Sequence, residues 1–578
     1  MSCGISRKLF LELDPPTEED NRSSWQRICD SLREKGCEDV KASAFVLRKL
    51  YPLCEEAGWK LTISLCYDGK GWDAVDLEAG DTSDAHYGFA VDLGSTTVVM
   101  QLIHCNTGEV VAQESAYNQQ IAFGEDILTR IFYAHERDGG LSPAPDAGEQ
   151  KCVYFPCPAM HKTFSEHLEE LRLATVDTII GLMERIAAKT GIDTKKCLSM
   201  TVAGNTTMIH FLIGMDAFCV FSAPYAVQAD QPGFLRGEEL DIPIRGYVFC
   251  YPGKANYLGG DIISGMVATD LYHRESISLF FDVGTNGELV VGNRDFLLCG
   301  AGAAGPALEG GVVKTGMRAA DGAVQHICFT YADPSPESEE RAGQEQTPAE
   351  SLSPADTYSG RKNQETIIIG RNTCTVQLDV IGGGMPTGIC GSGIIDLISE
   401  LFLHGLIDLR GKFVPESSDA ITFRPQEGEY AFCYAPGLWF YQSDIQEFIR
   451  TKAAAYTMME YLLSETGLEL EEVTDFYMAG AFGTHVKKES AVNIGMYPDV
   501  DPERIHAEGN TSLKGARMLL LNRDIAEELP EILDRMTYVQ FGAVEDFLQK
   551  MTAASALPHT DLERYPSVKA RLAMFHSA

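Results

Sequence analysis

Alternating apolar positions and amphipathic stretches predict a mixture of short strands and helices along the chain. Near the N-terminus, the pattern predicts strands over 9–13 and 60–67 and helices over 24–34 and 42–57. The polar run 80–84 predicts a boundary after this small α/β unit. Beyond that boundary, short apolar strands alternate with amphipathic helices, which is typical of an α/β fold.

Two segments interrupt this pattern and read as insertions. Residues 136–160 are rich in glycine, proline and charge, and residues 333–365 are rich in proline, serine and glutamate with almost no apolar side chains. The second segment has too little apolar surface to build a core of its own, so we expect a mobile surface loop there.

One strand–turn–strand pattern occurs twice. Residues 88–100 and 279–291 each hold an apolar strand ending in Asp-x-Gly, a turn rich in hydroxyl or amide groups, and a second apolar strand. Glycine in such a turn lets backbone N–H groups approach phosphate oxygens closely, so we expect two phosphate-binding hairpins. Asp-Gly pairs are also common in ordinary strand turns. The turn residues are Asp92, Gly94, Ser95, Thr96 and Thr97 in the first hairpin and Asp282, Gly284, Thr285, Asn286 and Gly287 in the second.

A second glycine motif follows each hairpin. Residues 199–204 predict a strand, and a Gly204-Asn205 turn and an apolar helix come next. Residues 475–479 predict another strand, which a glycine turn over 480–483 and a helix over 488–493 follow. Because both patterns recur in the same order, the sequence predicts a duplicated, two-lobed α/β fold. We expect the aspartates of the two hairpins to face each other across a cleft, where carboxylates favour hydrated Mg²⁺.

Two further glycine-rich segments have alternative interpretations. In residues 388–393, Gly391 and Ser392 open a predicted helix, whose first N–H groups face a nucleotide in one interpretation and only permit close helix–sheet packing in the other. Residues 300–305 spell G-x-G-x-x-G after a strand, but Pro306 and two later glycines interrupt the helix that a dinucleotide site requires. We therefore do not predict a Rossmann site.

Composition and charge narrow the classes of function. The chain has 578 residues, of which 45% are hydrophobic and 22% charged, and its net charge is −36. Such an acidic surface disfavours general binding to nucleic acid or to anionic membranes, so a bound nucleotide must be held by local N–H groups and a metal. No apolar run approaches the ~18 residues of a membrane span, and no signal peptide is evident, so we expect a cytoplasmic protein.

The 16 cysteines are scattered along the chain, mostly in apolar runs, which favours reduced, buried thiols over a disulfide framework. Cys152 and Cys157 form the tightest pair, but a second nearby pair that would complete a four-thiolate site is missing. No C-x2-C motif occurs, and we expect no iron–sulfur cluster in this chain.

These motifs together resemble a known family. The duplicated hairpins and residues 478–483 are similar to the superfamily of acetate and sugar kinases, heat-shock chaperones and actin, which implies a duplicated actin-like, ribonuclease-H-like ATPase. Within it, several motifs resemble the reductive activators of corrinoid proteins, over roughly residues 86–525. These motifs lie at 118–127, 203–208, 259–262, 303–310, 388–393 and 509–516. Residues 9–32 resemble the small domain that precedes the nucleotide domain in that family.

The resemblance implies a division of the chain and a set of nucleotide-binding residues. It implies a small α/β domain over 1–85, a first lobe over 86–275 and a second lobe over 276–578. ATP and Mg²⁺ are the implied cofactors, with Asp92 and Asp282 near the metal. The implied nucleotide contacts are the two hairpins, Gly204, Asn205, Gly391, Ser392, Gly480, Ala481 and Gly483.

The contacts of Asp92 and Asp282 with Mg²⁺ are expected to run through water. Three carboxylates inside the motifs, Glu288, Glu309 and Asp261, are candidates for orienting the attacking water, and each is equally explained as a structural hydrogen-bond acceptor. In this interpretation the lobes close on Mg·ATP, and hydrolysis changes the angle between them.

Members of this family couple ATP hydrolysis to reduction of an inactive Co(II) corrinoid, bound to a partner protein, to Co(I). The resemblance therefore implies a corrinoid protein as partner, a homodimer, and a separate low-potential electron donor such as a ferredoxin, because this sequence lacks the family's cluster motif. Two alternatives stay open, since a fold does not fix a function. One is a small-molecule kinase, and the other is a nucleotide-binding regulator without a redox role.

Overall fold

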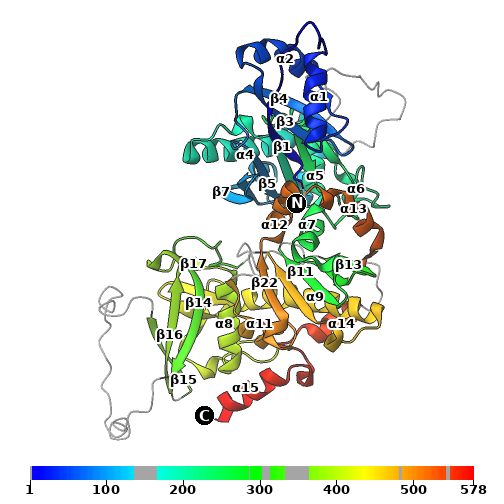
Figure 1. Ribbon diagram of the computed structural model, residues 1–578. Coiled ribbons are helices and arrows are strands. Elements are labelled where there is room, and N and C mark those ends of the chain that lie inside the picture. The colour runs from blue at the N-terminus through cyan, green and yellow to red at the C-terminus, as the bar shows by residue number, and fades with distance from the viewer. Residues whose placement is uncertain are drawn as a thin grey trace. The chain divides into compact units, whose positions relative to one another are not determined.

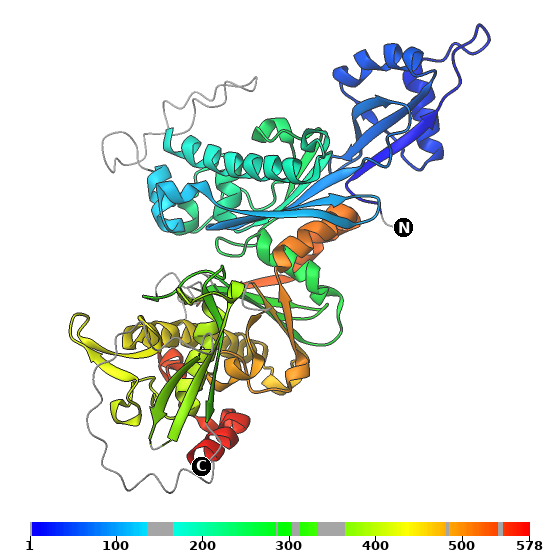
Figure 2. The same cartoon turned by 90° about the vertical axis from the view of Figure 1, so that its left-hand side faces the viewer.

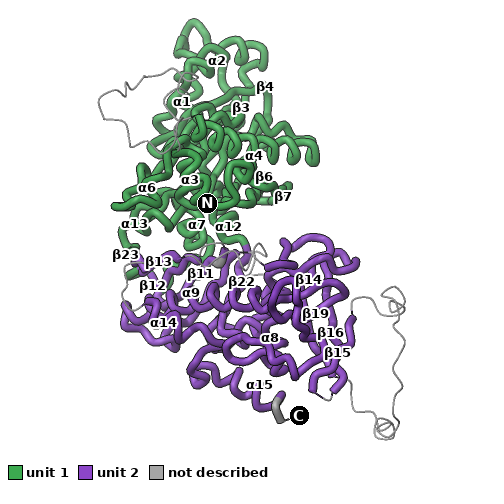
Figure 3. The backbone as a smooth tube through the Cα atoms, turned by 180° about the vertical axis from the view of Figure 1, so that it is seen from behind, with its two compact units in different colours: residues 1–274, 294–296, 510–538 green, residues 275–293, 297–509, 539–578 purple. Residues whose placement is uncertain are grey.

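The computed structural model describes residues 3–135, 166–284, 287–302, 313–331, 364–370, 372–480, 485–541 and 547–577. The chain forms two compact units (Figures 1 and 3). Unit 1 comprises residues 1–274, 294–296 and 510–538, and unit 2 comprises residues 275–293, 297–509 and 539–578. Both predicted insertions fall outside the described residues, except that strand β15 begins at Gln364.

Unit 1 begins with a small α/β domain whose sheet has the strand order β1-β3-β4-β2. Strand β3 and helix α1 have the predicted bounds. Strand β1 starts earlier than predicted, because it pairs with β3 along its whole length, from Ser6 opposite Cys66 to Glu12 opposite Lys60. The elements are β1 (Ser6–Glu12), α1 (Ser24–Glu34), β2 (Lys41–Ala42), α2 (Ala44–Glu56), β3 (Lys60–Tyr67) and β4 (Trp72–Ala79).

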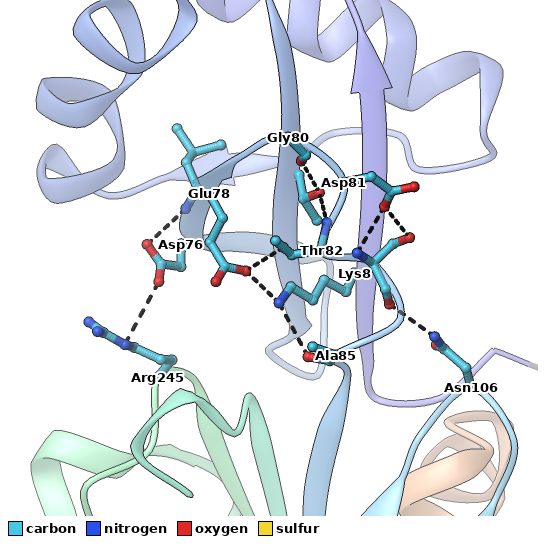
Figure 4. Close-up of polar contacts among 12 residues, drawn as sticks. Lys8, Asp76, Glu78, Gly80, Asp81, Thr82, Ala85, Asn106 and Arg245 are labelled. Atoms are coloured by element: carbon cyan, nitrogen blue, oxygen red, sulfur yellow. Dashed lines mark hydrogen bonds and ion pairs between the residues drawn. The ribbon is translucent and has the colours of Figure 1, made fainter. Parts of the chain in front are cut away.

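Polar contacts join this domain to the rest of unit 1 (Figure 4). The buried Lys8 ammonium pairs with Glu78 and donates a hydrogen bond to the carbonyl of Ala85 at 3.2 Å. Asn106 Nδ2 donates to the carbonyl of Ser83 at 3.0 Å. The connecting segment is thus bonded on one side to the small domain, through Lys8, and on the other side to the rest of unit 1, through Asn106.

The main sheet of unit 1 has the strand order β7-β6-β5-β8-β10-β9. Strands β7, β6 and β5 are antiparallel neighbours, whereas β5, β8 and β10 run parallel. The strands are β5 (Tyr87–Leu93), β6 (Thr97–His104), β7 (Glu109–Tyr117), β8 (Ser199–Gly204), β9 (Gly233–Arg236) and β10 (Tyr247–Cys250). The helices are α3 (Ile127–His135), α4 (Glu166–Thr190), α5 (Thr206–Ile213), α6 (Phe218–Phe221), α7 (Gly260–Thr269), α12 (Thr511–Leu521) and α13 (Asp524–Arg535).

Five strands of the main sheet of unit 2 repeat this topology, in the order β13-β12-β11-β21-β22, and β23 lies next to β13 at the edge of the sheet. Strands β13, β12 and β11 are antiparallel, and β11, β21 and β22 are parallel. The register also repeats, since Asp92 lies opposite Ala203 and Asp282 lies opposite Ala479. The predicted duplicated fold is therefore confirmed. The strands are β11 (Ser278–Val283), β12 (Gly287–Gly292), β13 (Leu297–Gly302), β21 (Asp475–Ala479) and β22 (Ile505–Gly509).

Two smaller sheets and several helices complete unit 2. The sheets have the orders β15-β16-β14-β17 and β18-β19-β20. Their strands are β14 (Ala323–Tyr331), β15 (Gln364–Ile369), β16 (Asn372–Val380), β17 (Gly388–Ile389), β18 (Ile421–Arg424), β19 (Glu429–Ala435) and β20 (Leu438–Tyr441). The helices are α8 (Gly391–Leu403), α9 (Gln442–Thr466), α11 (Lys488–Asn493), α14 (Phe547–Ala554) and α15 (Pro566–Ser577), and β23 (Met536–Val539) connects back from unit 1.

The two faces of β5 pack against different helices (Figure 2). Phe89, Val91 and Leu93 point into the core that α4 covers. The alternate positions point to the opposite face, where a Cβ on Gly88 would lie 3.0 Å from the Leu520 side chain of α12. Asp92 shares this second face and therefore points towards the N-terminus of α12.

Candidate functional site

The first hairpin forms a tight turn between β5 and β6. A Cβ on Gly94 would lie 2.4 Å from the carbonyl oxygen of Thr97, so only glycine fits at this position. The turn residues Ser95 and Thr96 are half-buried. The structure thus forms the predicted hairpin, and its phosphate-binding role stays a prediction.

Asp92, at the end of β5, is held by two side chains from the start of α12. Asn510 Nδ2 donates to Asp92 Oδ2 at 2.7 Å, and Ser512 Oγ donates to Asp92 Oδ1 at 2.9 Å. Burial raises the pKa of Asp92, and these two hydrogen bonds oppose that rise. Neither donor is among the predicted site residues, although both lie in the motif 509–516.

Asp261 provides a second carboxylate beside Asp92. It lies in the first turn of α7, where its Oδ1 accepts a hydrogen bond from the N–H of Ile262 at 2.9 Å. Burial raises the pKa of Asp261 to about 7, and the negative charge of Asp92 adds to the rise. Two neighbouring carboxylates with few counter-charges suit a divalent cation with oxygen ligands, and Mg²⁺ is such a cation.

Glycines allow the helix starts to converge on this pair. A Cβ on Gly204 would lie 2.7 Å from the carbonyl oxygen of Leu93, and one on Gly259 would lie 2.4 Å from the Cα of Asn205. The Asn205 side chain accepts from the N–H of Met208 at 3.0 Å and so caps α5. The backbone of Gly204 and Asn205 thus borders the site, while the Asn205 side chain is engaged in capping.

Helices α7 and α12 pack closely behind the two carboxylates. A Cβ on Gly515 would lie 2.0 Å from the carbonyl oxygen of Ser264. Tyr251 also donates a hydrogen bond to the carbonyl of Gly515 at 2.8 Å. The close packing fixes the start of α12, and with it Asn510 and Ser512, relative to Asp92.

The second hairpin is described only in part. Asp282 is half-buried and lies opposite the buried Glu288 across β11 and β12, while Gly284 and Gly287 flank the turn. Gly480 has a φ of +83° and donates its N–H to the carbonyl of Gly509 at 2.9 Å. The remaining predicted residues lie outside the described residues; they are Thr285, Asn286, Glu309, Ala481 and Gly483.

The glycine motif at the start of α8 makes a close packing contact. A Cβ on Gly393 would lie 2.3 Å from the carbonyl oxygen of Val324, and Ser392 Oγ donates to the carbonyl of Gln325 at 2.9 Å. Both Gly391 and Ser392 are buried. The packing interpretation therefore has direct structural support, and nucleotide contact by Gly391 and Ser392 stays a prediction.

The described residues contain no group of three or more histidine, cysteine or acidic side chains placed to hold a metal ion. The cysteines in these ranges are free thiols, and Cys152 and Cys157 lie outside them. No helix in the described part of the chain is long and apolar enough to cross a membrane.

The repeated sheet, the Asp-x-Gly hairpins and the glycine turns define a two-lobed protein of the actin-like ASKHA class. Three family models match the chain: the RACo linker region over 5–84, the RACo middle region over 87–144 and 159–274, and the C-terminal ASKHA domain of RACo over 276–350 and 359–569. The chain therefore belongs to the RACo family of reductive activators of corrinoid proteins.

Individual relatives agree with this assignment. The chain resembles the structure of a reductive activator for corrinoid, iron–sulfur protein with a TM-score of 0.81 and 30% identity, over 98% of this chain and 81% of that one. It is 28% identical to the corrinoid activation enzyme RamQ of Eubacterium limosum, over 80% of this chain and 69% of the relative. It is 27% identical to a Co(II) methylated amine-specific corrinoid protein reductase of Methanosarcina barkeri, over 50% of this chain and 46% of the relative.

Proposed function

We propose that this protein is an ATP-dependent reductive activator of a corrinoid protein. The observation that carries the proposal is the likeness to a reductive activator over 98% of the chain, in a fold with the Asp92 hairpin in place. The reaction takes one electron from a donor to convert Co(II) to Co(I) on the partner, while ATP and water give ADP and phosphate.

The residues around Asp92 are proposed to bind Mg·ATP. Asp92 and Asp261 are the carboxylates that would hold the hydrated cation, and Asn510 and Ser512 orient Asp92 for this role. When bound, Mg²⁺ neutralises negative charge on the phosphates as the terminal phosphoryl group is transferred to water. Backbone N–H groups of the first hairpin would contact the phosphates directly.

The second half is proposed to complete the nucleotide site. Asp282 and the hairpin glycines occupy the positions that match Asp92 and its hairpin in the repeated register. Gly480, Ala481 and Gly483 would contact the adenosine, and Glu288 or Glu309 would orient the attacking water. We further propose a homodimer and an electron donor on a separate low-potential protein, such as a ferredoxin.

The proposal is tested by the ATP turnover of the purified chain with and without a Co(II) corrinoid protein. A reductive activator hydrolyses ATP to inorganic phosphate faster when its corrinoid partner is present. A kinase transfers the phosphoryl group to a small acceptor, and phosphorus NMR distinguishes that product from inorganic phosphate. A phosphorylated acceptor, or tight ATP binding without turnover in the presence of the partner, would contradict the proposal.

A further inference from the structure

The segment from Asn118 to Arg130 holds the outer side of the first hairpin. Asn118 Nδ2 donates to the carbonyl of Gly94 at 3.1 Å, and its backbone N–H donates to the carbonyl of Thr96 at 2.9 Å. Between them, Arg130 donates from one terminal nitrogen to the carbonyl of Ser95 at 2.6 Å. Asn118 and Arg130 thus bind three successive carbonyls of the hairpin.

This arrangement determines where the hairpin N–H groups point. In a planar trans peptide, the N–H of one residue is directed opposite to the carbonyl of the residue before it. Because the carbonyls of Gly94 and Ser95 point towards Asn118 and Arg130, the N–H groups of Ser95 and Thr96 point away from them. Two successive N–H groups directed to one side form a concave anion-binding surface.

Arg130 is a fully buried cation with an incomplete set of partners. Its Nε donates to the carbonyl of Gly124 at 2.8 Å, and its other terminal nitrogen, Nη2, is buried without a hydrogen-bond partner. Its Nη1 also donates to Gln120 Oε1 at 3.3 Å, and the negative charge of Asp126 partly offsets the effect of burial, but no carboxylate among the described residues forms an ion pair with Arg130. Burial lowers the pKa of Arg130 to about 10, so the side chain keeps its charge at neutral pH. A buried charge is costly unless an opposite charge comes near it.

We propose that Asn118 and Arg130 are positioning residues of the phosphate site, and that the phosphates of ATP supply a further counter-charge to Arg130 from the other side of the hairpin. This inference rests on the proposed function, because it assumes that the first hairpin binds a nucleotide. Asn118 and Arg130 turn the hairpin N–H groups towards the ligand, and the guanidinium adds a positive charge behind them. The site thereby attracts a polyphosphate although the chain carries a net charge of −36.

The test compares Arg130→Gln and Arg130→Lys with the wild-type full chain. Affinities for Mg·ATP, Mg·ADP, AMP and adenosine are measured by calorimetry. Arg130→Gln is expected to weaken ATP binding by roughly tenfold or more, ADP less, and adenosine hardly at all, because the lost charge–charge attraction scales with the charge of the phosphates. Arg130→Lys keeps the charge without the planar guanidinium, so its ATP affinity is expected to lie between those of the wild type and Arg130→Gln.

Arg27→Gln is the matched control, because Arg27 is also a buried arginine but bonds to Asp20 in the small N-terminal domain. Its nucleotide affinities are expected to equal those of the wild type. Equal loss of affinity for adenosine and ATP in a folded Arg130 variant would show a merely structural role and overturn the inference. Wild-type ATP affinity in both Arg130 variants would also overturn it. ATP binding with the expected Arg130 effects but no Co(I) formation would contradict only the proposed function.

Discussion

Asn510 donates a hydrogen bond to Asp92 at 2.7 Å, although 418 positions separate the two residues in the chain. Asn510 also caps α12, since its Oδ1 accepts from the N–H of Leu513 at 2.7 Å. The same side chain therefore starts a helix from the second half of the sequence and orients the carboxylate of the first hairpin. Packing of α12 on the main sheet of unit 1 and formation of the site are thus coupled.

Asp92→Ala is expected to lower the rate of ATP turnover by at least about a hundredfold, because it removes a carboxylate proposed to hold the metal. Steady-state release of phosphate measures the loss, and circular dichroism checks that the variant is folded. Asp282→Ala is expected to behave in the same way. Full activity in both variants would contradict the proposed site.

Asn510→Ala is expected to lower kcat/KM for ATP by roughly tenfold, because Asp92 loses a hydrogen bond that orients it. It also removes a helix cap, which costs about 1 kcal/mol of unfolding free energy. Asn510→Asp separates these effects, because aspartate still caps α12 but cannot donate to Asp92. Asn510→Asp should lose at least as much activity as Asn510→Ala, because its carboxylate also repels Asp92. Wild-type activity in Asn510→Asp would show that the hydrogen bond has no role in turnover.

The pH dependence of metal binding should follow Asp261, whose pKa is raised to about 7. Because the folded chain holds this proton more tightly than the unfolded chain, the stability without metal should fall as the pH rises from about 4 to about 7. Mg²⁺ requires the ionised carboxylate, so its affinity should rise from about pH 6 to about pH 8.

Calorimetric titration of Mg²⁺ with ATP at several pH values measures this dependence. Asp261→Asn is the matched variant, and its stability and its metal affinity should vary less with pH over the same range. An unchanged pH profile in the variant would assign the titration to another group.

Gly515→Ala is expected to lower the unfolding temperature, because the added Cβ would lie 2.0 Å from the carbonyl oxygen of Ser264. Gly181 in α4 is the control, since a Cβ there meets nothing within 4 Å and alanine favours the helix by about 1 kcal/mol. Thermal unfolding should therefore shift in opposite directions for the two variants. A downward shift in Gly181→Ala equal to that in Gly515→Ala would contradict the packing explanation.

Local patterns predicted the repeated elements of the fold well. The bounds of α1, β3 and α11 follow from apolar periodicity and from the turns around them. The order hairpin, strand, glycine turn and helix was visible twice, and the matching register of Asp92 and Asp282 confirms that duplication. These features depend on residues that are close together in the sequence, so local patterns reveal them.

The partners of the first hairpin could not be derived in the same way. Asn510 and Ser512 reach Asp92 only because α12 packs on the sheet of unit 1, and periodicity does not say which sheet a helix covers. Arg130 looks like an ordinary charged residue in an amphipathic helix, and its burial emerges only in the folded chain. The motifs 118–127 and 509–516 were identified only through the family resemblance, which predicted no contact with the hairpin for either of them.

The optical spectrum of a corrinoid protein gives a direct test of ATP-dependent activation. The purified chain is mixed with a Co(II) corrinoid protein and a strong low-potential reductant, and the Co(I) band is followed with and without Mg·ATP. The Co(I) band is expected to grow only with Mg·ATP, and this growth is expected to be lost in Asp92→Ala. No growth with any of several corrinoid proteins, while the chain still binds ATP, would contradict the proposed function.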